Sequence, residues 1–182
     1  FIILRKQIII GITLLIVLWT NSCFAGPSLL SPGPRIAVAV HIDTAEKDIF
    51  GVELLESGIN RLVEAKFSLL MLDGMVLSGS SVTRDLRRSG IDDFNTPEQS
   101  KLKSFGQLND VSYVLLLTLH PLDISADIKA FDVSKGDYII GKKITQLKEA
   151  EPKPGFIDNI VSKFSHMIDS ELDTIITVIT KS

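Results

Sequence analysis

The stretch Arg35-Ile-Ala-Val-Ala-Val-His41 decides the fold, because it is a nearly continuous apolar run. Such a run predicts a β-strand that is buried on both faces, as in a sheet covered by helices. Residues 51–66 follow with apolar side chains mostly three or four positions apart, which predicts an amphipathic helix. The stripe of this helix consists of Val52, Leu55, Ile59, Leu62 and Val63. A second apolar run, Phe67 to Leu72, is closed by Asp73-Gly74 and predicts another buried strand.

Two shorter helices are predicted in the middle of the chain. Between Met75 and Asn95 the signal is weaker, with one apolar side of a short helix formed by Val82, Leu86 and Ile91. The same helix carries the basic residues Arg84, Arg87 and Arg88. Thr96-Pro97-Glu98-Gln99 predicts the start of the next helix, with Thr96 as its cap and Gln99 completing a capping box. Its buried side is expected to consist of Leu102, Phe105 and Leu108.

The following segment predicts a strand and a hairpin. Val111 to Leu119 gives the strongest strand signal, and Pro121 interrupts it because proline cannot donate to a ladder. Residues 124–130 alternate between apolar and polar, which predicts a strand whose wet face carries Ser125, Asp127 and Lys129. The alternation slips at residues 131–133, which indicates a β-bulge. Ser134 to Asp137 predicts a turn with glycine at a positive φ, after which Tyr138 to Leu147 returns as the second arm.

The element order is therefore β-α-β-α-β-β-β-α, with a further helix in the middle. Strands joined by helices are expected to be parallel, with a right-handed crossover in the first βαβ unit, and the last two strands form an antiparallel hairpin. The long apolar stripe of residues 156–179 predicts a final helix that covers the sheet. The predicted fold class is α/β, a mixed sheet of about five strands with helices packed on it.

The first 25 residues predict a secretory signal peptide. Arg5 and Lys6 precede the apolar run Ile8 to Trp19, and small residues lead to Ala25, after which we expect cleavage before Gly26. The apolar run covers 12 residues, whereas a membrane-spanning helix needs about 20. An uncleaved anchor is one alternative to cleavage.

A lipoprotein is the second alternative, with Cys23 as the acylated residue. Residues 26–34, which hold three prolines, would then be a tether rather than a flexible tail. Residues 35–182 are predicted to form a single α/β domain. Because position 1 is Phe rather than Met, we expect the sequence either to be truncated or to be read from an unusual start.

Charge and cysteine content exclude several classes of function. Loss of Arg5 and Lys6 with the signal lowers the 19 basic residues to 17 against 22 acidic ones, a net charge of −5. The sequence has no basic face, so a nucleic-acid partner is not expected. Cys23 is the only cysteine, so the mature chain has no disulfide, zinc–thiolate site or thiol nucleophile. Gly74 and Gly79 do not form a dinucleotide fingerprint, and no cofactor is expected.

Three segments resemble a group of bacterial envelope domains that includes CsgG, LpoB and the amino-terminal domain of TolB. Residues 35–40 look like the opening strand of these domains, residues 108–116 like the segment that enters their third strand, and residues 131–140 like their glycine hairpin. Asn109-Asp110 and Ser112 depart from the group's usual glycine-alanine and aspartate. The resemblance implies a non-enzymatic protein that binds partners in the envelope, and it carries over no partner-binding residue.

Polar residues at the ends of the predicted strands suggest one chemical site. The candidates for a metal site are His41, Asp43, Asp73, His120 and Asp123. If the three strands are parallel, these side chains approach one edge of the sheet, where open α/β sheets place ligands. Imidazoles and carboxylates bind divalent metals. The competing interpretation is that strands simply end in polar residues as they reach solvent, and the spacing contains no HxH or HExxH motif.

Other motifs favour plain structural interpretations. Ser78-Gly-Ser-Ser81 lacks the lysine of a P-loop and the order of a hydrolase elbow, so it is interpreted as a surface loop. His166 is expected on the surface of the last helix. The three arginines at positions 84, 87 and 88 form a solvated helix face or a contact for an acidic partner or an anionic lipid.

Together these features predict an exported, periplasmic or secreted domain that is not an enzyme and binds another envelope protein. One alternative is a hydrolase or metal-dependent enzyme that uses the strand-end histidines and aspartates. The other is a structural subunit that assembles through an exposed edge of the hairpin. Membrane attachment would come only from an uncleaved signal or a lipid on Cys23.

Overall fold

The computed structural model of the protein describes residues 33–46, 51–70, 75–145 and 156–181. Its strands are β1 (Arg35–Ile42), β2 (Met75–Leu77), β3 (Tyr113–His120), β4 (Ser125–Asp132) and β5 (Asp137–Thr145). Its helices are the short 3-10 turn η1 (Thr44–Glu46), α2 (Val52–Leu70), α3 (Ser80–Arg88), α4 (Gln99–Leu108) and α5 (Phe156–Lys181). The predicted signal peptide, its cleavage point and Cys23 lie outside the described residues.

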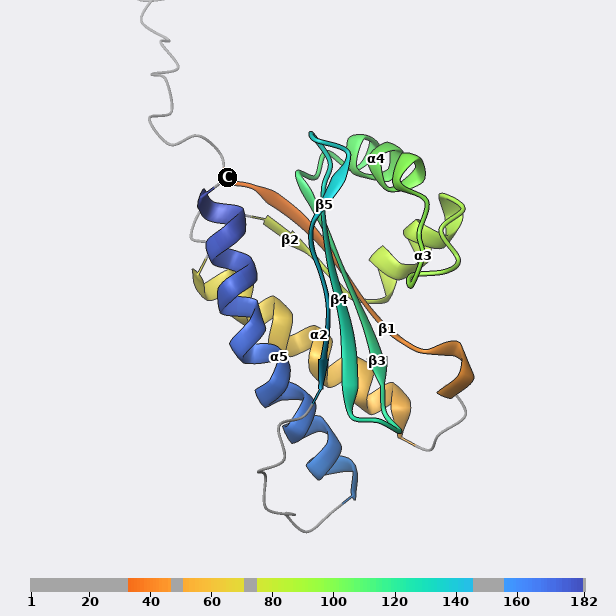
Figure 1. The fold of residues 1–182 in the computed structure, drawn as a ribbon, viewed down its shortest axis with the longest axis vertical. Helices are drawn as coiled ribbons and strands as arrows, with labels where there is room; N and C mark the ends of the chain where they lie inside the picture. The colour runs from red at the N-terminus through yellow and green to blue at the C-terminus, as the bar shows by residue number, and fades with distance from the viewer. Residues whose placement is uncertain (1–32, 47–50, 71–74, 146–155, 182) are drawn as a thin grey trace, which may run out of the picture. The chain divides into compact units, whose positions relative to one another are not determined.

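The five strands form one mixed sheet in the order β2-β1-β3-β4-β5. β1 is parallel to both β2 and β3, whereas β3, β4 and β5 are successively antiparallel. Figure 1 shows α2 and α5 on one side of the sheet and α3 and α4 on the other. The predicted α/β fold class, with three parallel strands and a hairpin, is confirmed.

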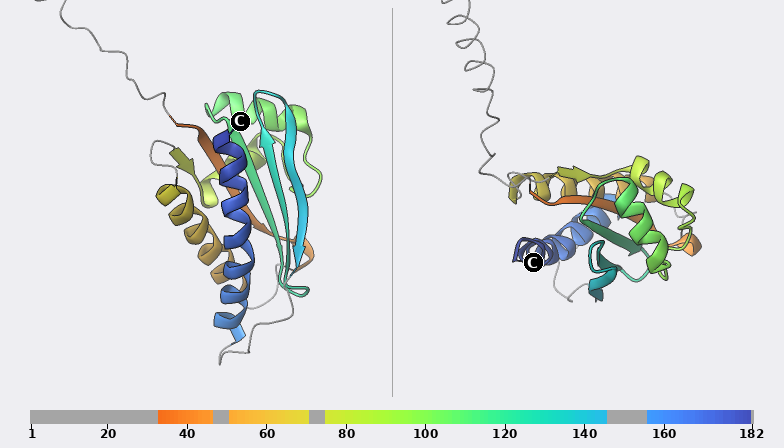
Figure 2. Two further views of the ribbon diagram at one scale, coloured as in Figure 1. Left: turned by 60° about the vertical axis from the view of Figure 1, so that its left-hand side comes forward. Right: turned by 90° about the horizontal axis from the view of Figure 1, so that it is seen from above.

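Both faces of the sheet are covered, as the apolar run of β1 predicts. Alternate residues of a strand point to opposite faces, so Ile36 and Val38 pack with α2 and α5, and Ala37 and Ala39 pack with α3 and α4. Figure 2 shows α5 lying along the sheet over most of its length. None of the helices that the structure describes has the length and apolar content to cross a membrane.

The predicted strand at residues 67–72 is wrong for residues 67–70, and residues 71–72 lie outside the described residues. Phe67 lies four residues after Val63 and is completely buried, so it extends the stripe of α2 by one more turn. The helix runs to Leu70, and the strand is instead β2, at Met75–Leu77. The apolar composition of this run suits a buried helix face as well as a strand, and the packing against the sheet decides for the helix.

The predicted capping box of α4 is also wrong. The hydroxyl of Thr96 donates to Oδ2 of Asp93 at 2.5 Å rather than capping the helix. This bond, together with backbone N–H groups that donate to the same carboxylate, lowers the pKa of Asp93. α4 begins only at Gln99, after Glu98, which makes no side-chain cap.

The predicted burial of two residues is wrong. Leu108 is 82% exposed, because apolar residues spaced three apart drift around a helix of 3.6 residues per turn. Ser125 is buried rather than on a wet face, since it pairs with His120 of β3 and Thr145 of β5. The predicted irregularity is found as a register shift between Ala130 and Phe131, but the extra residue is Ile139 of β5, because Ala130 pairs with Ile140 and Phe131 with Tyr138. The predicted turn is confirmed by Gly136, whose φ is 72°.

Candidate functional site

The structure does not bring all the predicted strand-end residues together in one site. β1 and β3 end at the same edge of the sheet, and Nδ1 of His120 lies 3.3 Å from Oδ2 of Asp43. His41 is buried on the face covered by α3 and α4, with its ring edge-on to Phe94 at 4.9 Å between centroids. Asp123 is exposed in the turn between β3 and β4. Asp73 lies outside the described residues.

His120 has two partners that sequence reasoning missed. Its Nε2 lies 2.8 Å from Oδ2 of Asp127, and its Nδ1 lies 3.9 Å from Oε1 of Glu46. The alternation along residues 124–130 had placed Asp127 on the polar face of its strand, which was the available signal. Glu46 gave no signal, because it belongs to the short turn η1 and reaches His120 only through the folded loop after β1.

His120, Asp43, Glu46 and Asp127 form one group of contacts, which we call the His120 cluster. This cluster links the loop after β1 to the turn between β3 and β4. The other oxygen of Glu46, Oε2, accepts the backbone N–H of Leu122 at 2.8 Å, so η1 is joined to the β3–β4 turn. The side chains of His120 and Glu46 are each 12% exposed. Both ring nitrogens of His120 face carboxylate oxygens. Within the described ranges, no three His, Cys, Asp or Glu side chains are arranged to hold a metal ion.

A crevice of about 610 Å³ opens at this same edge, beside the end of β1. We call it the arginine crevice. It is lined by His41 and Ile42 of β1, Glu53 and Glu56 of α2, and Ser80, Thr83, Arg84, Arg87 and Arg88 of α3. His120 is not among its lining residues, so the two histidines do not share one pocket.

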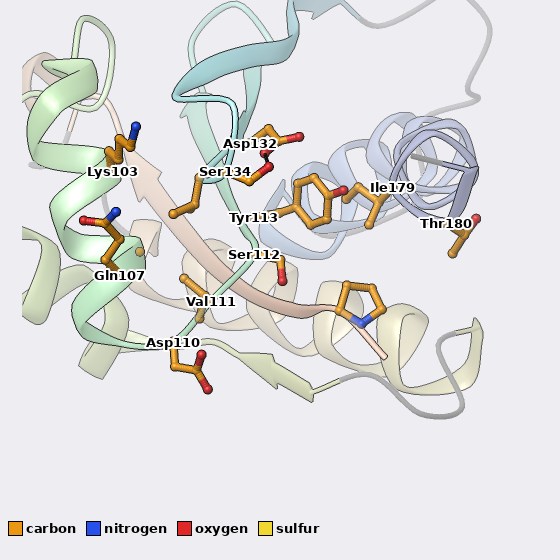
Figure 3. A pocket seen from close by; sticks show the side chains of 13 residues that line it. Lys103, Gln107, Asp110, Val111, Ser112, Tyr113, Asp132, Ser134, Ile179 and Thr180 are labelled. Atoms are coloured by element: carbon orange, nitrogen blue, oxygen red, sulfur yellow. Dashed lines mark hydrogen bonds between the residues drawn. The ribbon is translucent and has the colours of Figure 1, made fainter. Parts of the chain in front are cut away.

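A larger hollow of about 920 Å³ lies at the opposite end of the sheet, and we call it the end groove (Figure 3). Lys103 and Gln107 of α4 stand on one side of it, Ile179 and Thr180 of α5 stand on the other, and Tyr113 lies between them. The groove thus crosses the end of the sheet, where β1 and β3 begin and β4 ends. Sequence reasoning did not identify it, because its lining comes from four separate stretches of the chain.

Backbone hydrogen bonds fix the floor of the end groove. The N–H of Ser112 donates to the carbonyl of Arg35 at 2.7 Å, and the N–H of Val133 donates to the carbonyl of Ser112 at 3.0 Å. Asp110 has a φ of 52° and pairs with Nη1 of Arg35 at 2.7 Å. The loop between α4 and β3 is therefore held against the start of β1.

Asp132 forms the buried corner of the groove. Burial opposes its ionisation, but hydrogen bonds from the Ser134 hydroxyl and from Lys135 outweigh burial and lower the pKa of Asp132. The carboxylate holds the turn that follows β4, at 2.6 Å from the hydroxyl of Ser134 and 3.0 Å from the N–H of Lys135.

Gly106 allows α4 to approach this turn closely. A Cβ atom at position 106 would lie 2.3 Å from Cγ2 of Val133. Only glycine permits this approach, which sets the distance between α4 and the turn and so the width of the groove at that point.

Comparisons with known proteins return similar folds alone. No family model and no curated protein matches the chain. Among solved structures, the chain is similar to the LpoB C-terminal domain from Escherichia coli, with 17% identity and a TM-score of 0.40 over 67% of this chain and 88% of that one. It is similar to TolB from Acinetobacter baumannii, with 13% identity and a TM-score of 0.43 over 81% of this chain and 29% of that one.

A third similar structure is lipoprotein GNA1162 from Neisseria meningitidis, with 17% identity and a TM-score of 0.40 over 76% of this chain and 99% of that one. LpoB and TolB, two proteins of the group that the sequence resembles, are thus found again by structure. At these identities and TM-scores the likenesses assign neither an activity nor a partner to this chain.

Proposed function

We propose that this protein is an exported, non-catalytic accessory domain of the bacterial envelope, which binds another envelope protein through the end groove. The observation that carries the proposal is the groove itself, a hollow of about 920 Å³ that joins α4, α5 and the ends of three strands. Its lining mixes hydrogen-bonding side chains such as Gln107 and Ser134 with apolar ones such as Val133. Protein interfaces have the same mixture, and they tolerate an open, hydrated rim.

An exposed leucine adds to the case for a protein partner. Leu108 follows Gln107 at the end of α4 and is 82% exposed. A single exposed leucine is ordinary, and Leu108 does not itself line the end groove. It directly follows a lining residue, so a partner that extends past the groove over the end of α4 would bury it.

The competing enzyme hypothesis receives less support from the strand-end residues. Carboxylates face both nitrogens of His120, and His41 packs against Phe94 rather than beside His120. Ser125, the residue opposite His120 in the sheet, is completely buried and therefore inaccessible to a substrate.

We also propose the location and the processing of the chain. Residues 1–25 form a signal peptide that is cut after Ala25, residues 26–34 form a tail, and residues 35–182 form the domain. The alternative is a lipoprotein that is cut before Cys23 and held at a membrane. The intact mass of the exported protein decides between them, since it corresponds either to a start at Gly26 or to an acylated start at Cys23.

Site-specific photo-crosslinking in living bacteria tests the binding proposal. A photoreactive amino acid replaces Gln107 in the end groove, and in a matched control it replaces His166, which is exposed on α5. We expect a discrete crosslinked product from position 107 and none from position 166, and only when the full chain with its signal is expressed. Equal crosslinking from both positions, or none from position 107, contradicts the proposal.

Assembly through β5 is a second candidate. β5 is an edge strand, and in the part of the chain that the structure describes no strand pairs with its outer side. Such an edge is a template for pairing with another copy. Lys142 and Lys143 lie on β5, and Lys142 pairs with Glu171 of α5, which works against open edge-to-edge pairing. Sedimentation over a concentration series tests this candidate, because a strictly monomeric mature domain excludes it.

A further inference from the structure

The arginine crevice lies where two helices leave the sheet in opposite directions. α2 follows β1 onto the face that it shares with α5, and α3 follows β2 onto the other face (Figure 1). β1 and β2 are adjacent and parallel. When the connections from two such strands diverge, they open a crevice at the carboxyl ends of the strands, and open α/β proteins bind ligands there. β2 pairs only with residues 35–37, so the end of β1 extends past it to the crevice.

One side of α3 forms a positively charged wall of this crevice. Ser80, Thr83, Arg84 and Arg87 are spaced three, one and three residues apart, so they form a single stripe along the helix. Arg88 also lines the crevice, and its Nη1 lies 3.5 Å from Oδ1 of Asp85. The three arginines are exposed, and guanidinium groups bind phosphate oxygens through paired N–H donors.

A buried hydroxyl in the same wall lacks a partner. Thr83 is 8% exposed, and within the described residues its Oγ1 has no hydrogen-bond partner. An unsatisfied buried hydroxyl is costly, and a ligand oxygen in the crevice would satisfy it. The amino-terminal end of α3 reaches the crevice at Ser80 and follows Gly79, which provides no side-chain cap. Uncapped N–H groups at a helix start favour an anion.

We propose that the arginine crevice binds a small phosphorylated molecule, a phosphate monoester that also carries hydroxyl groups. The phosphate lies against Arg84 and Arg87, within reach of the Thr83 hydroxyl. On the opposite wall, the carboxylate of Glu53 accepts hydrogen bonds from the hydroxyl groups of the ligand, while the phosphate lies on the arginine side. The crevice volume of about 610 Å³ lies in the range of small-molecule sites.

This site is separate from the end groove, which lies at the other end of the sheet. The proposal therefore adds a ligand to the protein and does not depend on the proposed protein partner. A photo-crosslink at Gln107 and ligand binding at the crevice can fail independently of each other.

Titration calorimetry on the purified, exported full chain tests the proposal at fixed ionic strength. The probes are glucose 6-phosphate, inorganic phosphate and unphosphorylated glucose, and vesicles of phosphatidylglycerol are a separate arm. We expect saturable binding of one glucose 6-phosphate per chain, weaker binding of inorganic phosphate, and no binding of glucose. Tight binding to the vesicles without binding of glucose 6-phosphate overturns the small-ligand proposal, and so does equal binding of glucose.

Three variants locate the ligand. The pair Arg84→Gln with Arg87→Gln should weaken binding of glucose 6-phosphate at least tenfold. The control pair Arg61→Gln with Lys163→Gln makes the same change of net charge on α2 and α5 and should leave binding within twofold. Equal losses from the two pairs mean that the effect is only one of overall charge, and they overturn the assignment.

The third variant, Thr83→Val, separates a binding role from a structural one. Because Oγ1 of Thr83 has no partner in the described structure, its removal should leave the urea midpoint of the ligand-free protein unchanged or higher. Binding of glucose 6-phosphate should nevertheless fall severalfold. Unchanged binding in this variant contradicts the role given to the Thr83 hydroxyl.

Discussion

Replacing Gly106 with alanine should destabilise the domain, although alanine favours helices. The new Cβ would lie 2.3 Å from Cγ2 and 2.7 Å from Cγ1 of Val133, whereas carbon atoms in favourable contact are about 3.5–4.0 Å apart. Overpacking a dense core costs about 1–3 kcal/mol, and an overlap above 1 Å (by comparison with that contact range) places this site at the upper end. The helix-propensity gain of alanine returns about 1 kcal/mol. We therefore expect a net loss of about 2 kcal/mol in the free energy of unfolding.

Urea unfolding followed by far-UV circular dichroism measures this loss. With a slope of about 2 kcal/mol per molar, the midpoint should fall by about 1 M. Gly58→Ala on α2 is the matched control, because its nearest atom is Cγ1 of Val161 at 3.2 Å. A small movement of that side chain accommodates the methyl group, so the control should change stability by less than about 1 kcal/mol.

A double-mutant cycle shows whether the clash is with Val133. Val133→Ala removes both Cγ atoms and should cost about 1.5 kcal/mol by itself. In that background Gly106→Ala should cost little, which gives a coupling energy of about 2 kcal/mol. Two results would contradict this reasoning: a Gly106→Ala variant that is as stable as the parent, or effects of the two substitutions that simply add. Either result would mean that Gly106 is not required for the close approach of α4 to the turn after β4.

Three further outcomes are expected. Leu102→Ala should cost about 2–5 kcal/mol, and Leu108→Ala on the same helix less than about 0.5 kcal/mol, because Leu102 is completely buried and Leu108 is 82% exposed; equal losses in thermal or urea unfolding would contradict the burial pattern of α4. The lowered pKa of Asp132 means that its stabilising contribution is present above its ordinary value of 3.8 and is lost as the pH falls through the lower folded-state value. The stability of Asp132→Asn should thus depend less on pH below about pH 4 than that of the parent in an acid titration of unfolding. His120→Ala should lower the free energy of unfolding by about 1–3 kcal/mol, because it leaves three partly buried carboxylates without their common partner. An unchanged urea midpoint would mean that the His120 cluster does not stabilise the two loops.

Sequence patterns were most reliable where a single physical cause decided the structure. The apolar run 35–41 could only be buried on both faces, and the interrupted run 111–119 had to end near Pro121. The slip in alternation at residues 131–133 lies next to a register shift, but the extra residue is Ile139 of β5. Patterns failed where two structures suit the same residues. The position of Phe67 in the sequence is compatible either with a buried strand or with one more turn of the preceding helix. The packing around the residue decides between the two.

The candidate site divided in the same way. Parallel strands brought Asp43 and His120 together, as the order of elements predicted. The alternation of a strand could not show that His41 turns to the face of α3 and α4, where Phe94 covers it. Glu46 reached His120 through a short turn whose path has no periodic pattern in the sequence.

By itself, the sequence determined the fold class, the order of the elements, the acidic charge and the absence of cysteine beyond Cys23. These follow from composition and from periodicity along one chain. Only the tertiary structure decided where residues from distant segments meet. The end groove joins four stretches of the chain, and the arginine crevice depends on α2 and α3 leaving adjacent strands toward opposite faces. Concave sites are made by such convergence in space, and periodicity along the chain carries no record of it.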